Sequence, residues 1–345
     1  APGLWLPPSM NTRDARLVIA PNWIGDAVMS LPVLRALKRN APTRRLAVLA
    51  RPGPAAIYRA EGSADEVRVA RGFLASFRIA AQGGFGEAWL LPNSFRAALV
   101  PFLALVPERI GYASDGRGPL LTNALPPPPR TGHQLRDYDP LLESRGIEPD
   151  LDPPRLPLSA ESTGRAREAF ARAGLPADRP LVLLAPGAAF GWTKRWPAER
   201  FGRLGQLLLE RGLLSALVIG PGEERLAEEA RVAAGGYLPA LGADLDPMGV
   251  AALAARAQVV VSNDSGPMHL AAAVGTPVVA IFGPTDPGRT GPCGVPSEVL
   301  DRYVFCSPCY LKECPYQHEC MREIGVETVL GAVLRLVAQR VGFRT

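Results

Sequence analysis

The residues with the clearest potential for chemistry follow a β-branched run at residues 259–261. This run leads into Asp264, Ser265 and Gly266, and an apolar run begins directly afterwards, so the pattern predicts a buried strand, a short turn and a helix N-terminus. We expect Asp264 or Ser265 to cap the helix and Gly266 to let a ligand approach the backbone. Free first-turn amides and the helix dipole favour an anion. The turn therefore predicts a phosphate site with His269 beside it, and the alternative is an ordinary connection that binds nothing.

Lys194 is a second candidate for the same anion. It follows an apolar run at residues 181–185 and a glycine-containing turn at 186–191, and the chain has only two other lysines, Lys38 and Lys312. A lysine at the end of a strand suits a phosphate oxygen as a compact point charge. An ordinary solvated lysine is the alternative.

Two further groups of carboxylates follow predicted strands or precede helices. Glu223 and Glu224 come after the apolar run at residues 215–220, where a carboxylate either accepts hydrogen bonds from ribose hydroxyls or caps the next helix. Asp244 and Asp246 have the spacing of a metal-diphosphate site, but they precede a helical pattern. We interpret Asp246 as its cap and expect no catalytic metal there.

Asp26 lies at a third junction between a predicted strand and a helix. A strand at residues 16–20 ends at Pro21, and Gly25 and Asp26 begin an amphipathic helix that is expected to run to about Arg39. Gly25 indicates close approach of another group to the backbone. Helix capping is the simpler role for an aspartate in this position.

A cluster of cysteines lies near the end of the chain. Cys306, Cys309, Cys314 and Cys320 form a CxxC-x4-C-x5-C pattern that includes His318. This density leaves three alternatives open: a structural zinc or iron–sulfur site, disulfides in an oxidising setting, or free thiols.

These candidates must be positioned by two α/β domains. Short apolar runs alternate with helical patterns in both halves, which is typical of doubly wound parallel sheets. Proline-rich stretches at residues 126–129 and 149–157 mark the crossing, the second being the better hinge candidate. We expect an N-terminal domain over residues 1–155, a C-terminal domain over 156–325, and a closing helix at 326–345 that packs back toward the N-terminal domain.

Composition restricts the partners of the chain. Of 345 residues, 47% are hydrophobic and 21% charged, which is typical of a globular enzyme. The net charge of +5 resides in residues 1–150, which hold 18 Arg and Lys against 13 Asp and Glu. This excess favours an anionic partner, with codon bias toward arginine as the alternative explanation, and no aromatic-interleaved basic motif indicates nucleic acid. Residues 1–10 do not resemble a secretory signal and no run is long enough to span a bilayer, so a cytoplasmic location is expected.

Four groups of residues together resemble the lipopolysaccharide heptosyltransferases that use ADP-heptose. They are residues 22–30, residues 186–197, the stretch 263–277 and the cysteine-rich tail, and the resemblance covers nearly the whole chain after Arg16. Ala189 and Phe190 replace a hydroxyl pair of the first-heptose branch, so the chain looks closest to the second-heptose branch, heptosyltransferase II. Ser265 stands where many relatives have threonine.

The resemblance implies a GT-B fold with two Rossmann-like domains, in which the N-terminal one binds the acceptor and the C-terminal one binds the nucleotide sugar. It also implies an inverting transfer of heptose to an anionic lipid A core acceptor, without an essential metal cofactor and with peripheral contact at the inner face of the inner membrane. By position, Asp26 matches the general base, Lys194 the lysine that contacts phosphate, and Glu224 a ribose contact. The donor-binding turn is matched by Asp264, Ser265, Gly266 and His269.

Alternatives to this interpretation also remain. A nucleotide-sugar epimerase or hydrolase of the same fold would need no acceptor, and a transferase of the same family would use another sugar. A metal-binding interaction protein built around the cysteine tail is the alternative outside enzymology.

Overall fold

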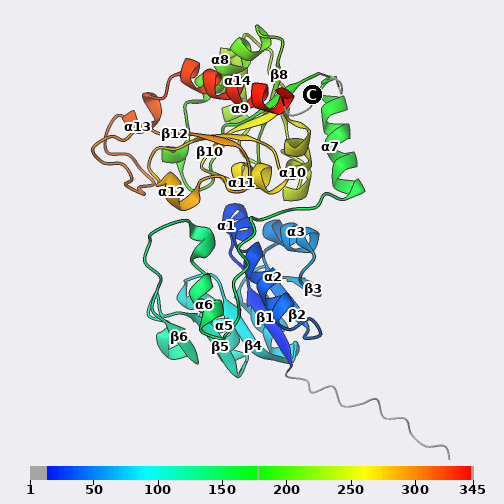
Figure 1. Cartoon of the computed structure of the whole chain (residues 1–345), viewed down its shortest axis with the longest axis vertical. Coiled ribbons are helices and arrows are strands. Elements are labelled where there is room, and N and C mark those ends of the chain that lie inside the picture. The colour runs from blue at the N-terminus through cyan, green and yellow to red at the C-terminus, as the bar shows by residue number, and fades with distance from the viewer. Residues whose placement is uncertain (1–13, 177–178, 343–345) are drawn as a thin grey trace, which may run out of the picture. The chain divides into compact units, whose positions relative to one another are not determined.

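The computed structural model describes residues 14–176 and 179–342. The N-terminal stretch assessed above for a secretory signal lies outside these residues. The chain divides into two compact units, each with its own six-stranded sheet (Figure 1). Unit 1 comprises residues 1–130 and 135–152, and unit 2 comprises residues 131–134 and 153–345. No helix in the described ranges is both long enough and apolar enough to cross a lipid bilayer.

Unit 1 is a parallel α/β unit. Its strands are β1 (Ala15–Ile19), β2 (Leu46–Ala50), β3 (Glu66–Val69), β4 (Phe85–Leu90), β5 (Glu108–Tyr112) and β6 (Asn123–Leu125). Its α-helices are α1 (Ile24–Met29), α2 (Leu31–Asn40), α3 (Pro52–Glu61), α4 (Phe73–Gln82), α5 (Phe95–Leu103) and α6 (Asp139–Glu143), and short 3-10 helices lie at η1 (Gly118–Leu120) and η2 (Gln134–Arg136).

Unit 2 repeats this architecture. Its strands are β7 (Leu181–Ala185), β8 (Leu214–Val218), β9 (Ala240–Leu241), β10 (Val259–Asn263), β11 (Val278–Ile281) and β12 (Ser297–Leu300). Its helices are α7 (Ala160–Arg172), η3 (Trp192–Lys194), α8 (Ala198–Leu209), α9 (Glu224–Ala233), α10 (Pro247–Arg256), α11 (Gly266–Ala273), α12 (Pro287–Thr290), α13 (Glu319–Arg322) and α14 (Val326–Gly342).

Both sheets reverse their winding direction between two central strands. The strand order is β3-β2-β1-β4-β5-β6 in unit 1 and β12-β11-β10-β7-β8-β9 in unit 2, and all pairs are parallel. The winding changes direction between β1 and β4 and between β7 and β10. In open parallel sheets, ligands bind beyond the carboxyl ends of the strands at such a switch point. The fold thus points to the loops after β1 and β4 in unit 1 and after β7 and β10 in unit 2.

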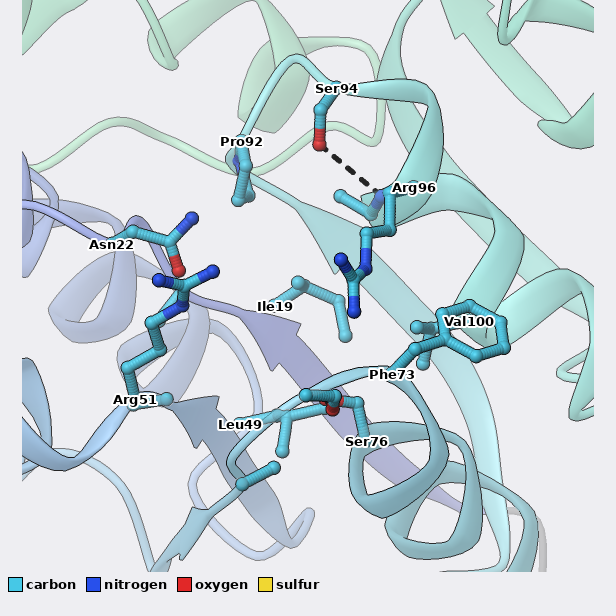
Figure 2. Close-up of a pocket in the computed structure, with 15 residues that line it drawn as sticks. Ile19, Asn22, Leu49, Arg51, Phe73, Ser76, Pro92, Ser94, Arg96 and Val100 are labelled. Carbon is cyan, nitrogen blue, oxygen red and sulfur yellow. Dashed lines mark hydrogen bonds between the residues drawn. The ribbon is translucent and has the colours of Figure 1, made fainter.

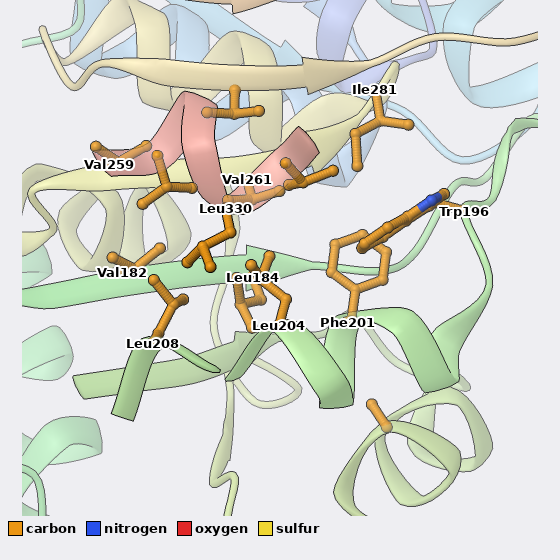
Figure 3. Close-up of a cluster of buried hydrophobic side chains, with 14 of the residues drawn as sticks. Val182, Leu184, Trp196, Phe201, Leu204, Leu208, Val259, Val261, Ile281 and Leu330 are labelled. Carbon is orange, nitrogen blue, oxygen red and sulfur yellow. The ribbon is translucent and has the colours of Figure 1, made fainter. Parts of the chain in front are cut away.

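The sheet of unit 2 is covered on both faces, which explains its continuous apolar strands. Alternate residues of β7 and β10 point to opposite faces. Val182, Leu184, Val259 and Val261 join one core with α8 and α14 (Figure 3), whereas Leu183 and Val260 join the other with α7, α10 and α11.

Two helices differ from the sequence-based prediction. The helix that was expected to run to Arg39 is split at Ser30 into α1 and α2, because Pro32 at the start of α2 has no N–H to continue the first helix. The closing helix α14 was expected to pack toward the N-terminal domain, but its buried residues Val329 and Val333 belong to the core of unit 2.

A buried carboxylate ties together the amino ends of the strands in unit 1. Glu87, with a side chain only 4% exposed, accepts hydrogen bonds from Arg16 Nε at 3.1 Å, from Trp89 Nε1 at 2.7 Å and from Arg44. Arg16 is buried as well. Removing one partner of such a pair leaves the other charge unpaired in the interior.

We expect Glu87→Ala to lower the free energy of unfolding by about 3–5 kcal/mol, because it leaves the buried Arg16 guanidinium without its carboxylate partner. Glu108→Ala is the matched control, since it breaks the exposed pair with Arg145 and should cost at most about 1 kcal/mol. Urea titrations with a common m-value measure both changes. Equal losses would contradict the importance of burial at Glu87.

Candidate active site

The turn after β10 forms as predicted, but its carboxylate does not cap the helix. Ser265 is the N-cap of α11 and makes no side-chain cap bond. Asp264 is 5% exposed and accepts hydrogen bonds from Lys194 Nζ at 2.5 Å, Thr285 Oγ1 at 2.7 Å and Thr290 Oγ1 at 3.2 Å. The structure therefore brings together two residues that the sequence identified separately, and adds two threonines that the sequence did not indicate.

Lys194 reaches this carboxylate from the loop after β7. It ends the short helix η3, and its side chain is 13% exposed. Its ammonium also lies 4.9 Å from the centre of the Phe190 ring, which is within the range of a cation–π contact. The result is a partly buried positive charge beside the N-terminus of α11, where first-turn amides lack intrahelical acceptors.

Asn263 holds the two switch-point loops together, and sequence reasoning did not single it out. It is fully buried; its Oδ1 accepts from Trp196 N at 3.0 Å and its Nδ2 donates to Pro186 O at 2.8 Å. An amide can donate and accept at once, so it suits a position between two backbones. Its place directly before Asp264 at the end of a β-branched run was the only available signal.

The cysteine-rich tail supports the Lys194 loop. Thr193 Oγ1 donates to Leu311 O at 2.7 Å, and His318 Nε2 lies 2.6 Å from Thr193 O. The His318 ring packs edge-on against Trp192, with centroids 4.9 Å apart. Through these contacts, the tail positions the backbone from which Lys194 projects.

Arg195 is a further cation in this loop. Its guanidinium donates to Ala188 O at 3.2 Å and closes the loop on itself, and its buried Nε has no hydrogen-bond partner among the described residues. A buried donor without a partner is costly, so this atom is a natural contact for a ligand oxygen.

His269 lies in the first turn of α11 and is buried. Burial lowers the pKa of His269 to about 4; the Asp264 charge opposes this shift, and the charges of His133 and Lys194 add to it. The imidazole is therefore neutral at pH 7, and it can accept or donate a hydrogen bond but adds no positive charge.

The two glutamates after β8 have different environments. The Glu223 carboxylate lies against Gly187: a Cβ added at Gly187 would lie only 2.0 Å from Glu223 Oε1. The same carboxylate accepts a hydrogen bond from Gly220 N at 2.9 Å. Glu224 is exposed and accepts from Gly222 N at 3.2 Å within its own turn. Of the two, Glu223 is placed beside the carboxyl end of β7, whereas the family resemblance had matched Glu224 to the ribose contact.

The remaining polar candidates in unit 2 are Asp246 and the four cysteines of the tail. Asp246 caps α10 by accepting from Gly249 N at 2.8 Å, as predicted. Cys306, Cys309, Cys314 and Cys320 are free thiols; burial and the neighbouring thiols raise the pKa of Cys320 to about 11. Across residues 14–176 and 179–342, no three His, Cys, Asp or Glu side chains are grouped as metal ligands.

Asp26 belongs to unit 1 and lies in the first turn of α1, after Trp23 as the N-cap. It is partly exposed at the carboxyl end of β1. Two buried phenols lie near it: burial and, to a smaller extent, the Asp26 charge raise the pKa of Tyr58 and of Tyr138. Tyr58 is fixed by Ser30, whose Oγ lies 2.9 Å from its hydroxyl. Asp26 is thus a carboxylate at the switch point beside two buried phenols, and Trp23 takes the N-cap position of its helix.

Comparisons with known proteins agree with the fold and the motifs. The model of glycosyltransferase family 9 (heptosyltransferase) matches residues 81–319. Lipooligosaccharide heptosyltransferase 2 of Haemophilus ducreyi is 31% identical over 80% of this chain and 85% of its own length, and lipopolysaccharide heptosyltransferase 2 of Salmonella typhimurium is 31% identical over 82% and 87%. The solved structure of E. coli ADP-heptose LPS heptosyltransferase II is 25% identical, covers 94% of this chain and 99% of that one, and superimposes with a TM-score of 0.82.

The resemblance inferred from the motifs and the predicted GT-B fold are both confirmed. The chain belongs to glycosyltransferase family 9, the heptosyltransferases, and is a glycosyltransferase.

Proposed function

We propose that this protein is an inverting heptosyltransferase that transfers heptose from ADP-heptose to the inner core of lipopolysaccharide. The Lys194–Asp264 pair at the switch point of unit 2 carries the proposal, because Asp264 fixes the Lys194 ammonium where the fold predicts a ligand. The names of the relatives, among them an ADP-heptose LPS heptosyltransferase II, support the choice of donor and acceptor.

In unit 2, the ADP moiety would lie across the ends of β7 and β10. Lys194 and the amides of Ser265 and Gly266 would bind the diphosphate, and Asp264 would hold the lysine in place. His269 would contribute a neutral hydrogen-bonding group below the same turn. For the ribose hydroxyls we favour the Glu223 carboxylate over Glu224, because Glu223 lies against Gly187.

In unit 1, Asp26 would act as the general base. Its carboxylate takes the proton from the acceptor hydroxyl, and the oxygen attacks the anomeric carbon of heptose as the bond from that carbon to the ADP oxygen breaks. ADP leaves with the bonding electron pair, and the positive groups of unit 2 stabilise the charge that develops on it. A single displacement of this kind inverts the anomeric centre.

The acceptor is a lipid, so we place the reaction at the inner face of the inner membrane, with the protein in peripheral contact. The excess of positive charge in residues 1–150 is consistent with an anionic acceptor surface.

Mass spectrometry of products from ADP-heptose and defined lipid A core acceptors tests the proposal. We expect the acceptor to gain one heptose, with inverted anomeric configuration by NMR, and ADP to be released in equal amount. Donor incubated alone should remain intact on the same time scale. Rapid turnover without acceptor would replace the transferase with an epimerase or hydrolase.

A further inference from the structure

A pocket in unit 1 lies beyond the carboxyl ends of four adjacent strands. Its lining includes Ile19 at the end of β1, Ala50 at the end of β2, Ala70 after β3 and Pro92 after β4. The pocket therefore spans the point between β1 and β4 where the winding of the sheet reverses. This is the unit 1 counterpart of the place that the donor turn takes in unit 2.

Two arginines enter this pocket from different elements. Figure 2 shows Arg51 and Arg96 approaching it from opposite sides, with Asn22 beside Arg51. None of the fifteen lining residues is acidic, and neither arginine forms an ion pair with any residue that the structure describes. Arg96 also stacks on Phe73, with its guanidinium carbon 5.8 Å from the ring centre, so its position is constrained.

The surrounding backbone strengthens the same preference. Arg51, Gly72 and Ser94 are the N-caps of α3, α4 and α5, so three helices of nine or ten residues begin at the pocket. The positive ends of their dipoles add to the charge of the two guanidinium groups. Such a site favours a planar or tetrahedral oxyanion, for which the guanidinium fork is well matched.

The pocket is also adjacent to the candidate base along the chain. Asn22 lines it, and the same loop continues into α1 and reaches Asp26 four residues later. A substrate anchored in the pocket by an anionic group would thus be held beside the loop that leads to Asp26.

We infer that the Arg51–Arg96 pocket binds an acidic group, a carboxylate or a phosphate, of the sugar acceptor. The inference rests on the proposed function, since it identifies where unit 1 would hold the acceptor. It assigns acceptor recognition to Arg51 and Arg96, and it makes the acceptor anion a determinant of the position of the attacking hydroxyl.

Steady-state transfer kinetics test the inference. Arg51→Met and Arg96→Met should each raise the acceptor KM about 10-fold or more, because each removes a charge-assisted hydrogen bond, while the ADP affinity stays the same. Arg59→Met is the matched control, since Arg59 is an exposed arginine of the same helix as Arg51 and does not line the pocket. An unchanged acceptor KM in both pocket variants would overturn the inference.

Modified acceptors identify the anion. Acceptor stripped of its phosphates and acceptor with methyl-esterified carboxylates are compared with the intact acceptor. The treatment that removes the bound group should raise the wild-type KM to the level of the variants and have little further effect on the variants themselves. A wild-type KM that neither treatment alters would refute recognition of an acceptor anion.

A separate measurement keeps this inference distinct from the proposed function. If the wild-type protein transfers heptose to no core acceptor, the proposed function fails, and inorganic phosphate then probes the pocket directly. Titration followed by NMR should shift the amide signals of Asn22 and Ser94 in the wild type and not in the Arg51→Met/Arg96→Met double variant. No shift in the wild type would show that the pocket does not bind anions.

Discussion

Replacing Asp26 with asparagine is expected to lower kcat for heptose transfer about 1,000-fold, because the variant keeps the shape of the side chain and loses the group that accepts the proton. Asp26 is a partly exposed first-turn residue and does not cap α1, so the fold should tolerate the change. The measurement is the rate of ADP release with saturating donor and acceptor. It should be accompanied by a thermal unfolding curve that matches the wild type.

Two controls separate loss of the base from other effects. Glu148→Gln removes an exposed carboxylate from the same unit and should leave kcat unchanged. ADP binding by calorimetry should be unaltered in Asp26→Asn, since the residues proposed to bind the donor all belong to unit 2. A variant that keeps near-wild-type kcat would eliminate Asp26 as the base and leave the donor site as described.

The central strands could be predicted because their apolar residues are uninterrupted. The β7 and β10 runs are buried on both faces, so their composition alone identified them and the turns that follow. The edge strands β6 and β12 could not be predicted in this way, because they lack a buried apolar run. Their residues alternate between intermediate and exposed positions, as in Ser297–Leu300, and their short polar sequences resemble loops.

The proposed donor site shows which contacts a sequence cannot reveal. Lys194 and Asp264 were each found from their position after a strand, but their pairing depends on β7 and β10 being neighbours in the sheet. The choice between Glu223 and Glu224 was also beyond the sequence. Two adjacent glutamates at a helix start have the same local pattern, and only the fold shows that one of them lies against Gly187.

The role of the tail illustrates a different limit. Its cysteine spacing left a metal site, disulfides and free thiols open, and its described contacts with the Lys194 loop come from His318 and from the backbone of Leu311. A histidine within a cysteine cluster is easily taken for a ligand. Here its ring nitrogen lies against the Thr193 carbonyl, and the distance of 125 residues between them hides the contact from any motif.

Replacing Lys194 with methionine is expected to weaken ADP binding about 10-fold to 100-fold, because the variant loses one charge-assisted hydrogen bond to the diphosphate, worth about 1.5–3 kcal/mol. The same change leaves Asp264 buried with only Thr285 and Thr290 as partners, so it should also destabilise unit 2. Calorimetry with ADP measures the first effect and urea unfolding measures the second. Lys312→Met is the matched control, because Lys312 is exposed and its Nζ lies 5.5 Å from the centre of the Phe190 ring that Lys194 also contacts.

The double variant Lys194→Met/Asp264→Asn separates the two effects. Neutralising Asp264 removes the unpaired buried charge, so the double variant should regain much of the stability that the single variant loses. It should not regain ADP affinity, since the positive charge is still missing. If ADP affinity recovered together with stability, Lys194 would serve only to neutralise Asp264, and the diphosphate would have to be held by the α11 amides and Arg195. Because stability is predicted to recover in the double variant while ADP affinity is not, a purely structural role for the pair and a role in binding the donor cannot give the same result.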